Sequence, residues 1–108
     1  MTDSNIVVVL TTLPLDADAA DFGRILVQER LAACVTILGE ATAMYRWQGE
    51  VCEDRERQLL IKTSRDRIEA LESRVRTLHP YDIPEFVVLP VAHGSLSYLT
   101  WVHGATRS

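Results

Sequence analysis

The sequence lacks features that mark two large classes of protein. No apolar run approaches the roughly 20 residues of a membrane-spanning helix, and the longest, Ile6 to Leu10, is the size of a strand. Basic residues are also few, because 11 Lys and Arg are set against 15 Asp and Glu, giving a formal charge of −4. Since nucleic-acid binding depends on cations that neutralise phosphates, the sequence predicts neither a membrane protein nor a nucleic-acid-binding protein.

Cysteines and catalytic signatures are also scarce. Cys34 and Cys52 form no CxxC pair, so free thiols are expected. The chain has no G-x-G-x-x-G, G-x-x-x-x-G-K-[ST], H-E-x-x-H or G-x-S-x-G motif. Its first five residues carry no positive charge and lead into no signal-peptide core, which predicts a cytoplasmic protein.

The residues that are present suffice for one hydrophobic core. Of 108 residues, 47% are apolar and 24% are charged, which is typical of one globular domain spanning residues 1–108. Periodicity and turn residues predict strands at 5–12, at 32–46 with an interruption at Gly39, at 51–61 and at 86–89. They predict helices at 16–31, at 68–78 and at 95–103, with Thr63 and Ser64 as caps of the second helix and a frayed tail at 105–108.

The order of these elements predicts an α+β fold. The first six form the ferredoxin-like βαββαβ unit, an antiparallel sheet with both helices on one face, followed by a short C-terminal helix. Apolar runs in the first, third and fourth strands need cover on both faces, whereas two helices cover only one. We therefore expect another copy of the chain, or the long second hairpin folded back, to cover the other face.

Two short segments carry polar or aromatic groups that suggest binding. Tyr45, Arg46 and Trp47 are of the types enriched at interface centres, although cross-strand packing and ligand contact are alternatives. Lys62 and Thr63 follow an apolar run, where a lysine held in a partly dry cleft would attract a carboxylate or phosphate. The alternative for Lys62 is a side chain that extends to solvent with its stem packed on the sheet.

A third segment, residues 79–85, combines titratable groups with two prolines. His79 with Glu85 or another carboxylate suits Cu²⁺ or Zn²⁺, but the segment offers at most three ligands and a closed zinc site needs four. The alternative is a helix end, with His79 near the negative end of the helix dipole, Tyr81 packed and Glu85 in a salt bridge.

Several blocks together resemble the CutA family of divalent-ion tolerance proteins. The resemblance extends from Val7 to about Val102. It is carried by the segments Leu31-Ala32-Ala33-Cys34-Val35, Tyr45-Arg46-Trp47-Gln48-Gly49-Glu50, Leu60-Ile61-Lys62-Thr63, His79-Pro80-Tyr81-Asp82-Ile83-Pro84-Glu85, Leu89-Pro90-Val91 and Tyr98-Leu99-Thr100-Trp101.

The resemblance implies a ferredoxin-like homotrimer, similar in architecture to PII-type signalling proteins, with clefts between subunits. Tyr45, Arg46 and Trp47 would then lie at the trimer interface. The intersubunit clefts would be lined by Lys62, Thr63, Tyr81 and Cys34.

The sequence departs from the copper site proposed for some members of that family. Thr11 stands in place of a cysteine and Leu78 in place of the first histidine of a pair, which leaves His79, with Glu85 as a nearby carboxylate. No cofactor is expected to be required, and any binding of Cu²⁺ or another divalent metal is expected to be weak.

The leading hypothesis is a non-enzymatic cytoplasmic homotrimer that binds a small anion or a divalent metal ion and acts in metal tolerance. Two alternatives are an acyl-phosphate hydrolase on the same fold and a purely structural trimeric assembly module. The hydrolase needs a phosphate cradle, whereas Arg24 and Arg30 lie on a predicted helix without a Gly-rich loop.

Overall fold

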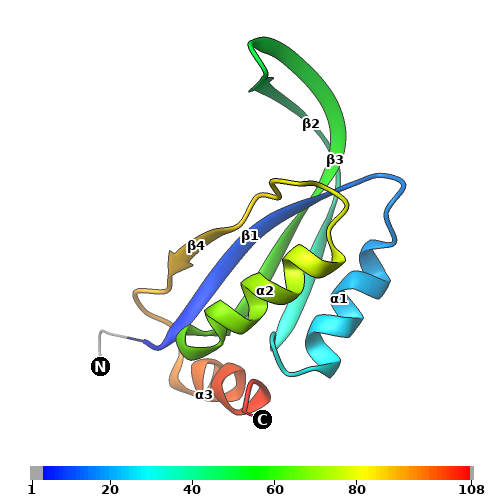
Figure 1. Ribbon diagram of the computed structural model, residues 1–108. Coiled ribbons are helices and arrows are strands. Elements are labelled where there is room, and N and C mark those ends of the chain that lie inside the picture. Colours follow the sequence, from blue (N-terminus) through cyan, green and yellow to red (C-terminus); the bar gives the residue numbers. More distant parts are fainter. Residues whose placement is uncertain (1–3, 108) are drawn as a thin grey trace.

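The computed structural model describes residues 4–107. These residues fold around one four-stranded antiparallel sheet. The elements follow the order β1 (Ile6–Pro14), α1 (Ala19–Gln28), β2 (Cys34–Trp47), β3 (Glu50–Ser64), a 3₁₀ turn (Arg65–Arg67), α2 (Ile68–Leu78), β4 (Val87–Pro90) and α3 (Leu96–Ala105). The strands are arranged β2-β3-β1-β4. This order, with α1 and α2 on one face, confirms the ferredoxin-like fold (Figure 1).

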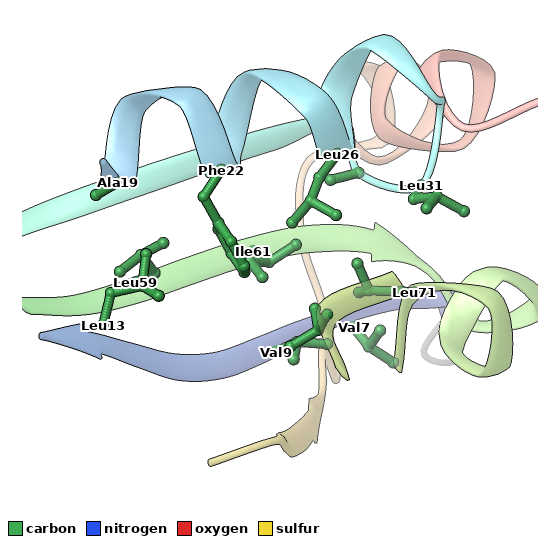
Figure 2. Packing of buried hydrophobic residues seen from close by; sticks show 12 residues of the cluster. Val7, Val9, Leu13, Ala19, Phe22, Leu26, Leu31, Leu59, Ile61 and Leu71 are labelled. Carbon is green, nitrogen blue, oxygen red and sulfur yellow. The ribbon is translucent and has the colours of Figure 1, made fainter. Parts of the chain in front are cut away.

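The core lies between the sheet and helices α1 and α2 (Figure 2). Alternate residues of β1 and β3 point toward the helices, because successive side chains of a strand face opposite sides. They pack against the apolar stripes of both helices. The cluster includes Val7, Val9, Leu13, Phe22, Leu26, Leu59, Ile61, Leu71 and Val75.

The opposite face of the sheet is apolar and mostly uncovered. Val8, Leu10 and Leu60 on this face are half-buried, and Val87 and Leu89 are both 45% exposed. Helix α3 packs only at the end near Ile6, through Val102 and neighbouring apolar residues. The chain therefore leaves one face of the sheet without cover, as its apolar strand pattern predicted.

The hairpin of β2 and β3 extends as an arm beyond the body of the sheet (Figure 1). Gln48 and Gly49 both have positive φ, 52° and 82°, which matches the type I′ turn preferred in two-residue hairpins. The ladder between β2 and β3 is irregular between Ile37 and Glu40, which confirms the interruption predicted at Gly39. The arm does not fold back over the open face, so that expected alternative cover is wrong.

Several predicted boundaries were wrong for local reasons. Helix α1 begins later because the side chain of Asp18 caps it, accepting a hydrogen bond of 3.0 Å from the Asp21 amide. It ends earlier because Arg30 takes a left-handed conformation with φ of 60°. Thr63 and Ser64 belong to β3. Ser64 takes the N-cap position of the 3₁₀ turn, but its side chain makes no capping hydrogen bond, and the N-cap residue of α2 is Arg67.

The predicted frayed tail is wrong for residues 105–107, and residue 108 lies outside the described residues. Thr106 is fully buried, its hydroxyl 2.5 Å from that of Ser64. Arg107 forms a two-pronged ion pair with Asp66, at 2.7 Å for each bond. The C-terminus of α3 is thus anchored to the segment that starts α2. None of the helices within residues 4–107 is long and apolar enough to cross a membrane.

Candidate functional site

Lys62 lies on the open face of the sheet, beside an aromatic residue of α3. In the strand register it is opposite Val8 of β1 and Cys34 of β2. Its ammonium nitrogen lies 5.4 Å from the centre of the Tyr98 ring, within the range of a cation–π contact. The ring of Trp101 lies 5.6 Å from that of Tyr98, so the two aromatic residues flank this end of the face together.

The surroundings keep Lys62 charged without an acidic partner. Hydrogen bonding to the Tyr98 side chain, followed by the electrostatic interaction with Cys34, raises the pKa of Lys62 above its ordinary value. Within residues 4–107 no carboxylate forms an ion pair with it. Glu85, for which a salt bridge was one alternative, forms no ion pair within residues 4–107 either, so the Lys62 ammonium can attract an anion.

The other cleft residues predicted beside Lys62 have different surroundings. Cys34 is a half-buried free thiol at the start of β2 and shares the open face with Lys62. Thr63 points to the opposite face, where it is fully buried and its hydroxyl donates a hydrogen bond of 2.7 Å to the Leu31 carbonyl. This hydrogen bond holds the loop before β2 in place. The Thr63 hydroxyl therefore does not point into the cleft in which it was predicted to bind a ligand.

His79 ends α2 in a buried position with both ring nitrogens in use. Nε2 donates a hydrogen bond of 2.6 Å to the Thr12 carbonyl, and Nδ1 accepts one of 3.1 Å from the Tyr81 amide. This network assigns the proton to Nε2. A metal ion at His79 would have to replace one of these hydrogen bonds.

The positions where copper-site ligands were expected also face the interior. Thr11 is fully buried, and its hydroxyl oxygen has no hydrogen-bond partner within the described residues. Leu78 is partly buried against the core. Within residues 4–107, no three His, Cys, Asp or Glu side chains gather into a group that could hold a metal ion.

Glu85 and Tyr81 line a groove between the arm and the loop that joins α2 to β4. Glu85 accepts a hydrogen bond of 2.9 Å from Gln58, whose side-chain amide also donates one of 2.9 Å to the Thr11 carbonyl. Tyr81 is 43% exposed, with its ring 4.9 Å from that of His79. The groove has a volume of about 710 Å³.

Within one chain the predicted site residues therefore fall into two separate groups, one around Lys62 and one around His79. Lys62 and Cys34 lie at the level of Val8 in β1, whereas His79 is tied to Thr12, four residues farther along that strand. The expected proximity of Lys62 to residues 79–81 does not occur within a single chain. Sequence reasoning also missed Tyr98 as a neighbour of Lys62, although its i, i+3 spacing from Trp101 on a short helix was a usable signal.

The aromatic residues at the tip of the arm are exposed. Tyr45 is 41% and Trp47 46% exposed, and Arg46 lies between them on β2. The hydroxyl of Tyr45 donates a hydrogen bond to the Asp54 carboxylate across the hairpin. This hydrogen bond is the main reason that the pKa of Tyr45 is raised to about 12.

Comparison with known proteins places these features in one family. Residues 7–105 match the model of the CutA1 divalent ion tolerance protein family. The chain is 50% identical over 99 residues to a divalent-cation tolerance protein CutA of Thermus thermophilus, covering 92% of this chain and 96% of that one. It is 42% identical over 101 residues to the Citrobacter koseri protein of the same name, covering 94% and 88%.

Solved structures agree with this assignment. The Thermus thermophilus divalent cation tolerance protein superposes with a TM-score of 0.91 at 48% identity, covering 94% of this chain and 99% of that one. CutA of Xylella fastidiosa gives a TM-score of 0.91 at 43% identity, covering 96% and 100%. With its family model, its relatives and its fold in agreement, the chain belongs to the CutA1 divalent ion tolerance protein family.

Proposed function

We propose that the chain acts in divalent-ion tolerance, including tolerance to copper, as a cytoplasmic homotrimer without catalytic activity. In this proposal, small anions or divalent metal ions bind in clefts between subunits. The observation that carries it is the open sheet face, which is apolar along its length and carries an unpaired lysine at one end.

The open face supports self-association. Apolar surface removed from water contributes roughly 25 cal/mol per Å², so exposed valine and leucine side chains in neighbouring strands favour burial against a partner. The exposed Tyr45 and Trp47 indicate that the arm also takes part in self-association, since aromatic residues are common at interface centres. Three copies arranged in a closed ring would cover all three faces, as family membership leads us to expect.

Assembly is tested by light scattering at micromolar concentrations. We expect a mass three times that of the 12.1 kDa chain, and a monomer would refute the proposal. Trp47→Ala should weaken assembly, and Leu96→Ala is the control because Leu96 is 79% exposed on α3, away from the arm. Equal masses of wild type and Trp47→Ala at every concentration would place Trp47 in solvent.

Lys62 supports the binding of a small anion at this end of the open face. Its charge is flanked by the Tyr98 ring and lacks a carboxylate partner within the described chain, so a carboxylate, sulfonate or phosphate would meet an uncompensated cation. A subunit that covers the apolar face would also exclude water around Lys62 and strengthen this attraction.

The anion site is tested by thermal shifts with a panel of small anions. Lys62→Met keeps the aliphatic stem and removes the charge, so stabilisation by anions should vanish while the trimer persists. Arg24→Met removes one exposed cation on α1 and serves as the control. If no anion raises the wild-type melting temperature, Lys62 does not form an anion site.

Metal binding at His79 and Glu85 is the other part of the proposal. Both side chains are already hydrogen-bonded, so a metal ion would compete with existing contacts and bind weakly. Calorimetry with Cu²⁺ on wild type, His79→Gln and Glu85→Gln tests this, and equal affinities would exclude both residues.

A further inference from the structure

Lys62 is the only charged residue in two rows of side chains that cross the open face. Strand pairing aligns it with Cys34 of β2, with Val8 of β1 and, through Val8, with Leu89 of β4. Residues paired in this way point to the same side of an antiparallel sheet. The next row consists of Thr36, Leu60, Leu10 and Val87. One ammonium group is thus set in a surface that is otherwise uncharged and largely apolar.

Two aromatic rings of α3 lie beside this ammonium group. Helix α3 lies at the end of the sheet where β1 begins, and its Val102 packs there with Ile6 (Figure 1). The Tyr98 ring lies 5.4 Å from the Lys62 nitrogen, and the Trp101 ring lies 5.6 Å from the Tyr98 ring at an angle of 37°. Trp101 is 49% exposed, so much of its ring surface is free to contact a ligand held at Lys62.

The single positive charge favours an anion with a single negative charge. A phosphate dianion beside one ammonium group would keep a net charge next to apolar side chains, and an unpaired charge in such surroundings is costly. Phosphate sites usually combine arginine side chains or several free amides at a helix start. At the start of α3 the Tyr98 amide is already engaged, because it donates a hydrogen bond of 3.3 Å to the Ser95 hydroxyl. A carboxylate carries one charge, which Lys62 balances.

The rings of α3 favour a flat, unsaturated body on that anion. Aromatic rings in offset-stacked or edge-to-face contact gain affinity beyond the apolar area that they bury. An aliphatic ring of similar size buries a similar area without this gain. A ligand whose carboxylate reaches Lys62 and whose ring reaches Trp101 uses the charge and the aromatic surface together.

We propose that the anion site at Lys62 takes an aromatic monocarboxylate. The carboxylate pairs with the Lys62 ammonium group, and the ring stacks on Trp101. The ligand lies at the α3 end of the intersubunit cleft. This inference rests on the anion site of the proposed function and narrows its ligand to one chemical class.

The ligand class is tested by calorimetry and thermal shift on the full-length protein with benzoate. Cyclohexanecarboxylate has the same charge and a similar size but no aromatic face, benzyl alcohol has the ring without the charge, and inorganic phosphate has charge without a ring. We expect benzoate to bind at least threefold more tightly than cyclohexanecarboxylate, and both to bind more tightly than phosphate or benzyl alcohol.

Failure of the ligand class and failure of the anion site give different results. If none of the anions binds to the wild type, the anion site is refuted, and the aromatic class with it. If anions bind and Lys62→Met abolishes that binding, the site stands. Equal affinities for benzoate and cyclohexanecarboxylate, or tighter binding of phosphate, would then overturn the aromatic class alone.

Variants of Trp101 test the stacking contact. Trp101→Phe keeps an aromatic ring and should retain the preference for benzoate, whereas Trp101→Leu should lower benzoate affinity to that of cyclohexanecarboxylate. Leu96→Ala is the control, because Leu96 is 79% exposed on the same helix. A preference for benzoate in Trp101→Leu as strong as in the wild type would refute the contact.

Fluorescence gives a direct measure of the same contact. The chain has two tryptophans, so Trp101 is the only one left in Trp47→Phe. Light scattering establishes that this variant keeps the wild-type mass. Benzoate should change the Trp101 emission and saturate at the concentrations found by calorimetry, whereas phosphate should leave it unchanged. Unchanged emission with benzoate bound would overturn the stacking.

Discussion

The two faces of the sheet have similar side chains but different surroundings. On the face beneath α1 and α2, Val9 and Ile61 are fully buried, whereas on the opposite face Val87 and Leu89 are 45% exposed. Apolar residues in a strand thus show that a face needs cover, but not whether the same chain provides it. In this protein α1 and α2 cover one face, whereas α3 covers only one end of the other.

The largest effect is expected on the covered face. Leu26→Ala removes a fully buried side chain of α1 and should cost about 2–5 kcal/mol in the free energy of unfolding. Leu96→Ala, at a position 79% exposed on α3, should cost far less. Denaturant titration measures both, and similar losses would contradict the contrast between covered and exposed positions.

A charge on the open face should act on assembly more than on the fold. Leu89→Asp adds a carboxylate to β4 at a half-exposed site, where one chain can hydrate it but a subunit interface cannot. We expect a lower mass by light scattering with a native-like circular dichroism spectrum. Leu96→Asp is the control, and an unchanged mass for Leu89→Asp would show that this part of the face is not an interface.

The hydrogen bond across the arm should be visible in a spectroscopic titration. The pKa of Tyr45 is about 12, chiefly because its hydroxyl is hydrogen-bonded to Asp54. In Asp54→Asn the pKa should move toward about 10, the ordinary tyrosine value. Tyrosinate absorbance reports this change, and Tyr45→Phe identifies the transition. An unchanged titration in Asp54→Asn would mean that the arm does not hold this contact in solution.

The smallest effect is expected where α3 is anchored by its ion pair. Hydrogen bonding to Arg107, the main cause, lowers the pKa of Asp66 in the folded chain. Its stabilisation is therefore present above the ordinary pKa of aspartate and is lost as the pH falls through the lowered folded value. Arg107→Gln should lower the melting temperature slightly near pH 7 but not in strong acid.

The control for this ion pair is Arg76→Gln, which removes an exposed partner of Glu72 within α2. It tests whether loss of any surface cation has the same effect on the melting temperature. A deficit in Arg107→Gln that persisted unchanged in strong acid would point to lost packing of the arginine stem rather than to the ion pair.

Local patterns predicted the fold well because most of them act within an element. The apolar stripe of Ile68, Leu71, Val75 and Leu78 predicted α2, and glycine predicted the irregularity in β2. Element boundaries were harder, because each depends on a single capping or left-handed residue, such as Asp18 or Arg30, and the order of the C-terminal tail depends on contacts with distant parts of the chain. The anchoring of Thr106 to Ser64 joins residues 42 positions apart, and no local pattern indicates it.

The candidate site was predictable in part. Strand periodicity alone would have put Lys62 and Thr63 on opposite faces of the sheet. The sequence therefore already indicated that only one of the two could line the open face. The hydrogen bonds of His79 were not, since they depend on how the loop after α2 returns to β1. Nor was the groove, because it requires the arm to curve toward that loop.

The position of Lys62 has a consequence for chemical labelling, because it is the only lysine in the sequence. A reagent that acylates side-chain amines can modify the chain at this residue alone, apart from the amino terminus. A raised pKa leaves less free amine to react, and a subunit or anion against the open face would slow the reaction further. The rate of acylation is thus a single-site measure of how accessible this end of the sheet is.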